Sequence, residues 1–541
     1  MSKGYFCSRF KFPRLCSFGV TSGKKVFRLH SLEPKADKRI CSYSPALRIK
    51  RPKVVTTHCY GQLWPFRMRT VVFAGATSSE KSTIFWSPVC SGSSKTNQKM
   101  DKREFLKKGS LGALGLALAP SFLQAAGSQQ VLRTAHIGVG NMGGEDLRAI
   151  ASHPNVEVAA LCDVDARYLG AAHKMHPKAR VFFDYRVMLE EMADEIDAVI
   201  VSTPDHTHAP ASLMAMQLDK PVYCQKPLTH HVSEAREMKK LATEKGLITQ
   251  MGIQVHSFYD YKLATLLIQS GIIGKVHTVH AWSPKNWGYD GAEPTGSDPI
   301  PDTLDWNLWQ GTAKVRPFKE GFYHPGNWRK LMDYGCGTLG DMGVHIFDTP
   351  YNALELDVPN TVRNECRPPN DFGFPEQNTV TYEFPGTRHT ADTLTWIWYD
   401  GPGAPPAHPD LSLPDSEVLH DQGAMFVGEK GRLYLPHFMK LPKLIVDGTY
   451  KEMDIDSFNL GSPVTDYERE SKKHYHQFVD ACLGRAECSA PFSYSARLTE
   501  TILLGVIAGR FPGETLHWDG QTARFREAKA NAFLSGEYRE F

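Results

Sequence analysis

The sequence predicts an α/β protein: a doubly wound parallel sheet, followed by an α+β domain with an open, mostly antiparallel sheet. Three observations predict it. From residue 131 onward, short apolar runs alternate with helical stretches, and the first run leads directly into a glycine cluster. Beyond residue 378, apolar and polar residues alternate as they do in half-buried strands. The chain has 541 residues, enough for two such domains, and we expect them at 131–255 and 256–541.

The N-terminal region differs in composition from the rest of the chain. Residues 1–99 hold 19 Lys and Arg against 3 Asp and Glu, a formal charge of +16, whereas the remainder carries −13. We expect a basic, disordered leader, which could be a nucleic-acid arm, a transit peptide or an extension upstream of the true start. The extension is favoured because Met100 opens a second N-terminal pattern. The acidic remainder argues against a nucleic-acid partner.

Residues 100–130 are similar to an export signal. Charged residues at 102–108 precede an apolar run at 111–119 that is too short to span a bilayer, and small residues follow at 125–127. The stretch resembles a twin-arginine signal, although Lys102 replaces the first arginine. It predicts export to the periplasm or cell envelope, with no stable membrane span. A cytoplasmic location is expected if the segment is not functional, and a buried helix is the structural alternative.

The glycine cluster has the context of a dinucleotide-binding loop. An apolar strand is expected at 134–138 and a helix at 145–153. The glycines permit a tight turn, close approach of a pyrophosphate, and packing of helix on strand, while N–H groups at the helix start attract phosphate. The residues predicted to bind the cofactor here are Gly138, Gly140, Asn141, Met142 and Gly143.

Asp163 ends the second predicted strand, 156–162, 20 residues after the last glycine. That spacing suits a carboxylate that accepts hydrogen bonds from the adenosine ribose. The same charge would repel a 2′-phosphate, so NAD is favoured over NADP, although Arg167 nearby keeps NADP open.

The alternation of strand and helix continues to residue 251. Strands are expected at 197–202, 221–224 and 247–251, and helices at 209–218 and 233–245. Ligands of such sheets bind at the carboxyl ends of the strands. The polar and proline residues expected there, as further cofactor contacts, are Thr203, Pro204, His206, His208, Gln225 and Lys226. For each histidine taken alone, ordinary helix-start hydrogen bonding is an equal alternative.

These motifs, in this order, resemble the Gfo/Idh/MocA family of oxidoreductases, over roughly residues 131–541. The resemblance implies that Lys226 lies beside the nicotinamide and the reacting hydroxyl. The family usually has Glu-Lys-Pro where this chain has Gln225-Lys226-Pro227. Loss of that carboxylate should ease deprotonation of Lys226.

The second half carries Asp341 and His345, four residues apart on one face of an expected helix. By themselves they indicate a capping acid with a core histidine, or half of a metal site. The resemblance implies instead a catalytic and substrate-binding pair, and no metal is predicted. Upstream, Trp306, Trp309, Trp328 and Arg329 suggest aromatic and polar contacts to a sugar; Trp328 and Arg329 are predicted to bind substrate, and core packing is the alternative for each tryptophan.

The resulting hypothesis is an NAD(P)-dependent oxidoreductase. It would transfer hydride between a secondary alcohol of a sugar or cyclitol and a tightly bound nicotinamide, with Lys226 or His345 taking the hydroxyl proton. The alternatives are an NAD-dependent glycoside hydrolase acting by transient oxidation, which the export-like segment favours, and a non-catalytic dinucleotide-binding protein. We also expect a homo-oligomer.

Overall fold

The computed structural model describes residues 130–541. The predictions for the basic leader, for the export-like segment and hence for localisation fall on residues outside this range. Among residues 130–541, no helix is both long and apolar enough to cross a lipid bilayer.

The N-terminal part is a six-stranded parallel sheet, as predicted, with strand order β3-β2-β1-β4-β5-β6. Buried aliphatic residues fill the central strands, as expected when helices cover both faces of a parallel sheet. Five of the six strands match predicted apolar runs; the short β3 was not predicted. The strands are β1 (Leu132–Ile137), β2 (Val156–Cys162), β3 (Arg180–Phe182), β4 (Ala198–Val201), β5 (Val222–Gln225) and β6 (Thr249–Gly252).

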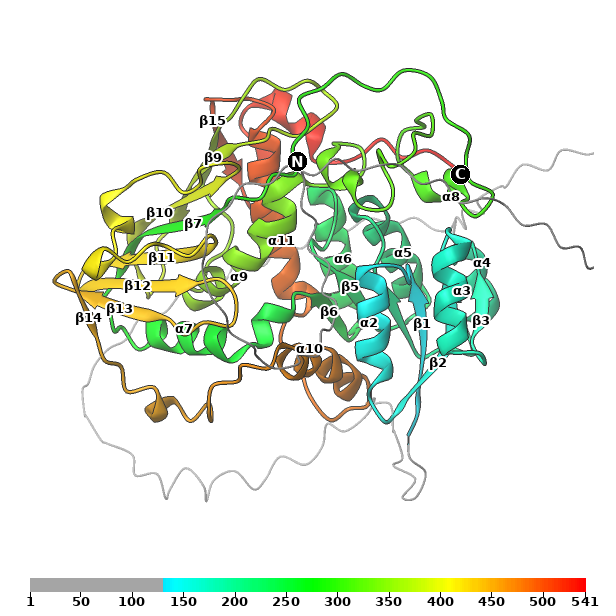
Figure 1. Cartoon of the computed structure of the whole chain (residues 1–541), viewed down its shortest axis with the longest axis horizontal. Helices are drawn as coiled ribbons and strands as arrows, with labels where there is room; N and C mark the ends of the chain where they lie inside the picture. The colour runs from blue at the N-terminus through cyan, green and yellow to red at the C-terminus, as the bar shows by residue number, and fades with distance from the viewer. Residues whose placement is uncertain (1–129) are drawn as a thin grey trace, which may run out of the picture. The chain divides into compact units, whose positions relative to one another are not determined.

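Helices connect these strands and pack against the sheet (Figure 1). They are α2 (Met142–Ala151), α3 (Ala166–Met175), α4 (Tyr185–Met192), α5 (Asp205–Gln217) and α6 (Val232–Lys245). Helix α6 ends where Gly246 adopts a left-handed conformation, the usual helix stop that the sequence predicted. Helix α5 begins at Asp205, four residues earlier than expected, because Pro204 can precede a first turn without losing a hydrogen bond.

The second sheet has ten strands in the order β14-β13-β12-β11-β7-β10-β9-β8-β15-β16, and all pairs are antiparallel except β7 with β10. The expected open, mostly antiparallel sheet is confirmed. Its strands are β7 (Val276–Ser283), β8 (Thr361–Glu365), β9 (Asn378–Pro385), β10 (Thr390–Asp400), β11 (Gly423–Gly428), β12 (Gly431–Pro436), β13 (Lys443–Val446), β14 (Thr449–Lys451), β15 (Thr515–Asp519) and β16 (Arg524–Phe525).

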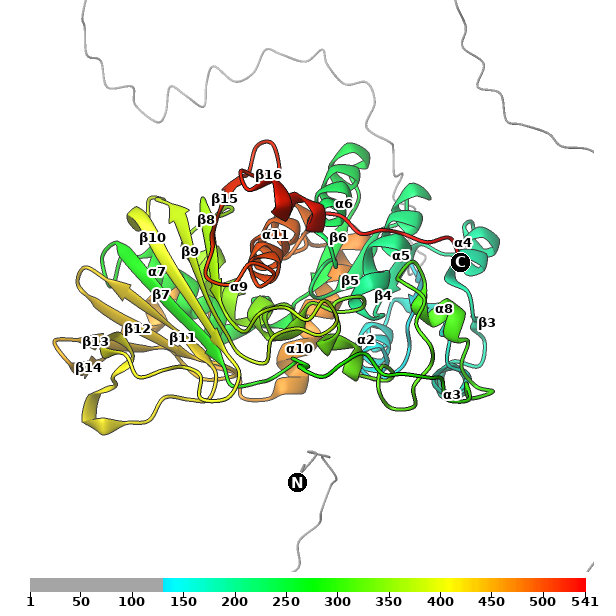
Figure 2. The same ribbon diagram turned by 90° about the horizontal axis from the view of Figure 1, so that it is seen from above.

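Helices separate and join the two sheets (Figure 2). Helix α9 (Val344–Ala353) packs on β7 and β11, and α7 (Tyr259–Gln269) packs on α9. Helix α11 (Phe492–Ala508) contacts α6 and β6 on one side and β8 on the other. Helix α10 (Tyr467–Cys482) packs on α2. The domain boundary near residue 255 remains a prediction.

A buried carboxylate fastens α11 to α6. Glu500 is fully buried and accepts two hydrogen bonds from Arg236 of α6, at 2.6 and 2.9 Å. It also accepts from Arg497 at 2.8 Å and from the Trp518 indole at 3.1 Å. Four donors around one buried carboxylate satisfy its charge, which makes loss of the carboxylate costly.

Replacement of Glu500 by Ala should therefore lower the free energy of unfolding by about 3–5 kcal/mol, because Arg236 and Arg497 keep their charges without a partner. Urea denaturation followed by circular dichroism measures this loss. The control is Glu244→Ala, which removes an exposed charge from α6, the helix of Arg236. It should change the free energy of unfolding by less than about 0.5 kcal/mol. A loss below about 1 kcal/mol for Glu500→Ala would contradict this role.

Candidate active site

The glycine loop lies between β1 and α2, and its geometry requires glycine at two positions. Gly138 has φ +81°, and a Cβ there would lie 2.6 Å from the carbonyl oxygen of Ser202. A Cβ on Gly143 would lie 2.2 Å from the carbonyl oxygen of Gly138. Gly143 therefore serves close packing of α2 against the end of β1, as the third glycine of the motif predicts. The loop brings the N-terminus of α2 to the carboxyl edge of the sheet.

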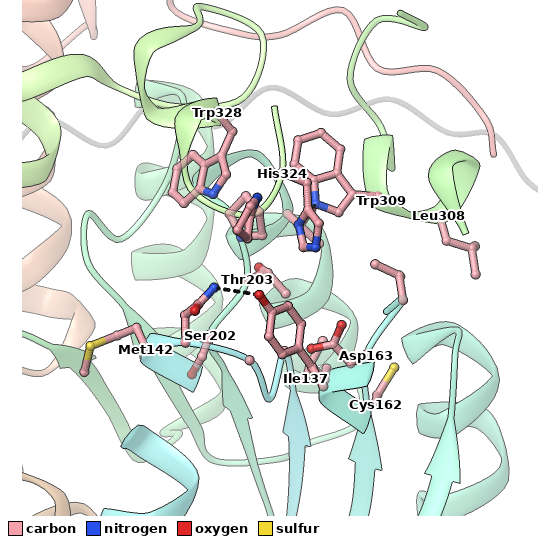
Figure 3. Close-up of a pocket in the computed structure, with 18 of the residues that line it drawn as sticks. Ile137, Met142, Cys162, Asp163, Ser202, Thr203, Leu308, Trp309, His324 and Trp328 are labelled. Atoms are coloured by element: carbon pink, nitrogen blue, oxygen red, sulfur yellow. Dashed lines mark hydrogen bonds between the residues drawn. The ribbon is translucent and has the colours of Figure 1, made fainter. Parts of the chain in front are cut away.

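A cavity of about 310 Å³ opens at this edge (Figure 3). Figure 3 shows Asp163 and Thr203 on its sheet side and Trp309, His324 and Trp328 on the opposite side. Of the residues predicted to bind cofactor, the cavity is lined by Gly138, Gly140, Asn141, Met142, Asp163, Thr203 and Pro204. The structure thus brings together the glycine loop, the acid after β2 and the turn after β4.

Backbone donors hold the Asp163 carboxylate in place. Its oxygens accept from the N–H of Val139 and the N–H of Asp165, each at 2.9 Å. Burial raises the pKa of Asp163 to about 6. Arg167, the residue that kept NADP as an alternative cofactor, pairs with Asp165 at 2.6 Å and does not line the cavity. No described cation in the cavity is therefore placed beside Asp163 to receive a 2′-phosphate.

A second cavity, of about 500 Å³, adjoins the first. The two share five lining residues: Met142, Ser202, Thr203, Trp328 and Arg329. The second cavity is also lined by Gln225, Lys226, Asp341 and His345. The residues predicted to bind substrate and to catalyse therefore meet in one place, next to the cavity of the glycine loop.

Asp341 accepts hydrogen bonds from several other residues that line this second cavity. It lies in a π-helical turn, Leu339–Gly343, directly before α9. Lys226, after β5, donates from Nζ to Asp341 Oδ1 at 2.9 Å and to its carbonyl oxygen at 2.8 Å. Arg329 Nε donates to Oδ1 at 3.2 Å, and Trp287 Nε1 donates to Oδ2 at 2.6 Å. Burial by itself would raise the pKa of Asp341, but Lys226 and Arg329 outweigh it and hold that pKa well below its usual range.

His345 lies on the next turn and is a neutral base. Burial, together with the nearby charge of Lys226, lowers the pKa of His345 well below its usual value. Its Nδ1 is buried and has no hydrogen-bond partner among the described residues. The ring of His437 lies 6.2 Å away, and burial lowers the pKa of His437 to about 3. At neutral pH both rings are neutral imidazoles, each with one N–H and one acceptor nitrogen.

The side chain of Gln225 faces away from the ammonium of Lys226. Its Nε2 donates to both oxygens of Asp146 in α2, at 3.0 and 2.9 Å. Ser202 and Tyr475 also donate to Asp146, at 2.6 and 2.7 Å, and burial raises the pKa of Asp146 to about 6. Residue 225 thus carries an amide, and the carboxylate bound to it is that of Asp146. The negative partner of Lys226 in the structure is Asp341, and the expected effect of Gln225 on Lys226 stays a prediction.

His206 and His208 do not reach either of these cavities, so their prediction as cofactor contacts is corrected. The ring nitrogens of His206 face the carbonyl oxygens of Tyr334 and Trp309, at 3.3 and 3.1 Å. Those of His208 face the carbonyls of Pro227 and Thr203, both at 2.8 Å. Both side chains are buried in the first turn of α5, where they join α5 to neighbouring segments. The alternative of helix-start hydrogen bonding is the one observed.

Some residues of the site were missed by sequence reasoning. They are Asp146, Tyr168, Asp205, Lys285, Trp287, His324 and His437. Asp205 lies within the predicted turn after β4, where a carboxyl side chain could have indicated a site residue. Burial raises the pKa of Asp205 to about 7. For Trp287 the only signal was a position shortly after a strand, and it reaches Asp341 only because β7 packs beside α9.

The first cavity fits the dinucleotide that the motif implies. The first turn of α2 leaves N–H groups without intrahelical acceptors, which suits a pyrophosphate. Asp163 provides an acceptor deeper in the same cavity, and the shared wall at Thr203 and Arg329 leads to Lys226. A dinucleotide that extends along this path would end beside Asp341 and His345.

Comparison with known proteins agrees with this arrangement. Residues 132–253 match the family described as "Oxidoreductase family, NAD-binding Rossmann fold", and residues 260–373 match its C-terminal alpha/beta domain. The inositol 2-dehydrogenase of Rhodococcus jostii is 32% identical over 157 residues, which are 28% of this chain and 42% of that protein. The uncharacterized oxidoreductase YrbE of Bacillus subtilis is 24% identical over 42% of this chain and 54% of its own length. The chain thus spans about half the length of these curated relatives.

Two solved structures have a similar fold. One is an inositol dehydrogenase homolog from Azotobacter vinelandii, complexed with NADH and myo-inositol (TM-score 0.51, 14% identity, 72% of this chain and 98% of that one). The other is the aldose-aldose oxidoreductase of Caulobacter crescentus, complexed with glycerol (TM-score 0.50, 16% identity, 72% of this chain and 100% of that one). The two matches to family models agree with the parallel sheet and the glycine loop: residues 132–253 and 260–373 are the two domains of the Gfo/Idh/MocA family of NAD-binding oxidoreductases.

Proposed function

We propose that this protein oxidises a secondary alcohol of a sugar or cyclitol, using NAD held in the first cavity. The observation that carries the proposal is the set of Lys226, Asp341 and His345 in one cavity that opens into the dinucleotide cavity. The similarity to inositol 2-dehydrogenases supports a polyhydroxylated ring as substrate. NAD is preferred because Asp163 and the position of Arg167 disfavour a 2′-phosphate.

The residues that would hold the cofactor follow from the cavity. The first turn of α2, at Asn141 and Met142, would bind the pyrophosphate, and Asp163 would accept from the adenosine ribose. Thr203 and Pro204 line the wall toward the second cavity. When bound, NAD accepts or donates hydride at C4 of its nicotinamide.

His345 is the residue best suited to take the hydroxyl proton. Lys226 Nζ is engaged by the carboxylate and the carbonyl oxygen of Asp341, whereas His345 is buried and, among the described residues, has no partner on Nδ1. We assign proton transfer to His345, and to Lys226 the donation of a hydrogen bond to the reacting oxygen. Asp341 orients Lys226 and balances its charge. This narrows the earlier choice between Lys226 and His345.

Trp328 and Arg329 form the wall that both cavities share. Arg329 lies over the Trp328 ring, 4.3 Å from its centroid, and donates to Asp341. The aromatic face of Trp328, with the Arg329 guanidinium stacked against it, suits the C–H face of a sugar ring. The guanidinium N–H groups suit the hydroxyls of the sugar. These residues would orient the ring so that one alcohol faces His345.

The direct test of the function is to purify the chain, denature it, and identify any dinucleotide that is released. The native protein is then mixed with NAD and a panel of hexoses and cyclitols, and absorbance at the wavelength of reduced nicotinamide is followed. Reduction of NAD with formation of a ketone supports the proposal. Binding of NAD without reduction by any compound of the panel would contradict it.

Replacement of Lys226 by Met should lower turnover by about two to four orders of magnitude and leave cofactor binding intact, because the reacting oxygen and Asp341 lose their donor. Steady-state kinetics and the Kd for NAD measure the two effects. Lys178→Met, an exposed lysine of the same domain, is the matched control and should retain full turnover. Unchanged turnover in Lys226→Met would remove Lys226 from the mechanism.

The affinity for NAD should depend on pH through Asp163, whose pKa is about 6 before cofactor binds. Ribose hydroxyls donate to the ionised carboxylate, so binding favours the charged form. Affinity is therefore full above about pH 7 and falls as pH drops through 6, by at most about tenfold per pH unit. Titration of NAD by calorimetry between pH 5 and 8 measures this dependence.

The matched variant for this dependence is Asp163→Asn, which keeps the shape and removes the charge. Its affinity should be weaker than that of the wild type at pH 8 and nearly constant down to pH 5. If Asp163→Asn keeps the wild-type pH profile, a group other than Asp163 causes the dependence.

A further inference from the structure

The second cavity is lined by an exposed lysine, Lys285, that forms no ion pair with an acid of residues 130–541; burial of its ammonium lowers its pKa, and the charge of Asp341 opposes this. Lys285 follows β7 and lines the cavity together with Lys226 and Asp341. The polar contact of its Nζ is the sulfur of Met342, at 3.1 Å, and a thioether is a weak acceptor. Among residues 130–541, no carboxylate lies within 4.0 Å of Lys285 Nζ. The ammonium therefore faces the cavity without a counter-ion from the described part of the chain.

The charges that line this cavity are not balanced. Three cations, Lys226, Lys285 and Arg329, face two acids, Asp205 and Asp341. Asp341 is already shared between Lys226 and Arg329, at 2.9 and 3.2 Å. Burial raises the pKa of Asp205 to about 7, so that acid is only partly ionised at neutral pH. By formal charge the lining therefore has one more basic than acidic side chain, and Lys285 is the basic one without an ion pair among the described residues.

A pyrophosphate at the proposed site would lie at the start of α2. Asn141, which precedes α2, lines the first cavity, and Met142 lines both cavities. Arg329 lines both cavities and could meet a phosphate, whereas Lys285 lines only the second. An anion that pairs with Lys285 must therefore come from the molecule bound in the second cavity.

The segment around Lys285 is anchored at both ends, so the ammonium is held near the cavity. The N–H of Lys285 donates to Ser283 Oγ at 3.3 Å, and its carbonyl accepts from the N–H of Gly401 at 3.1 Å. Two residues later, the N–H of Trp287 donates to Thr338 Oγ1 at 2.7 Å and its indole donates to Asp341. The same short segment thus supports Asp341 and presents Lys285.

We infer that the substrate is a carbohydrate or cyclitol that bears a carboxylate, such as a hexuronic acid, and that Lys285 binds this carboxylate. The inference rests on the proposed function, because it assumes that a polyol ring occupies the second cavity. In this arrangement Lys285 is a specificity-determining residue. The hydroxyl to be oxidised faces His345, while the carboxylate of the same molecule lies at the Lys285 end of the cavity.

The test compares D-glucuronate with D-glucose, which differ in the carboxylate, and D-glucose 6-phosphate as a second anion. The full-chain protein saturated with NAD is used. Calorimetry measures the Kd of each compound, and absorbance measures kcat/KM. The variants are Lys285→Met, Lys285→Arg, which keeps the charge, and Lys451→Met, which removes an exposed lysine of β14 as the matched control.

The expected result is that the wild type binds glucuronate about two- to fivefold more tightly than glucose, as one ion pair at an exposed lysine would give. Lys285→Met should remove most of this preference, Lys285→Arg should keep most of it, and Lys451→Met should keep all of it. Raising the salt concentration should reduce the preference of the wild type.

Three outcomes would overturn the inference: equal binding of glucuronate and glucose by the wild type, an equal preference in Lys285→Met, or a larger Lys285-dependent gain for the phosphate than for the carboxylate. The readouts separate this inference from the proposed function. Lys285-dependent binding of glucuronate without reduction of NAD supports the carboxylate site and contradicts the function. Oxidation of neutral sugars without tighter binding of glucuronate supports the function and contradicts the carboxylate site.

Discussion

The ion pair between Lys226 and Asp341 is the interaction on which the site depends. It joins the carboxyl end of β5 in the first domain to the π-helical turn before α9 in the second. Both side chains are nearly buried, at 13% and 12% exposure, so each charge needs the other. Arg329 and Trp287 complete the hydrogen bonding of the carboxylate. Because the pair crosses between domains, the position of His345 relative to the cofactor path follows from it.

The buried carboxylate of Asp146 explains how the chain tolerates glutamine at position 225 of the Gln225-Lys226-Pro227 motif. Where relatives in the family usually have Glu-Lys-Pro, this chain has Gln225 before Lys226, and the amide donates to Asp146. Glutamate at 225 would place two carboxylates in contact in a buried site, which is costly unless one is protonated. An amide at 225 and an acid at 146 are thus a compatible pair. The hydrogen bond from Gln225 to Asp146 joins α2, which follows the glycine loop, to β5, which precedes Lys226.

Burial controls the proton chemistry of the site more than neighbouring charges do. It is the largest influence on the pKa of His345, His437, Asp163 and Asp205. The histidines stay neutral, and the acids away from Asp341 move toward neutral pH. Asp341 is the exception, because two cations outweigh its burial. This leaves one firmly ionised acid, one neutral base and an excess of cations.

Local sequence determined most of the first domain and the identity of the reacting groups. The strand, glycine loop and helix are set largely by neighbouring residues: Gly138 is required by its φ of +81° and Gly143 by its contact with the Gly138 carbonyl, whereas the close approach of Ser202 to Gly138 comes from the neighbouring strand β4. Asp163 and Lys226 each follow a recognisable strand, whereas the roles expected of Lys226, Asp341 and His345 came from the resemblance to the family. Their types and spacing carry the chemistry, and the structure brings them to two adjoining cavities.

Tertiary structure alone decided which side chains touch. Gln225 meets Asp146 because α2 packs against the first sheet, whereas Trp287 meets Asp341 and Lys285 reaches the cavity because β7 packs beside α9. His206 and His208 followed the expected strand, yet they turn toward backbone carbonyls within and beside α5 instead of the cavity. Such contacts join residues far apart in sequence, so no local periodicity records them. They depend on how whole helices and sheets pack, which is why the sequence could place the reacting groups but not their partners.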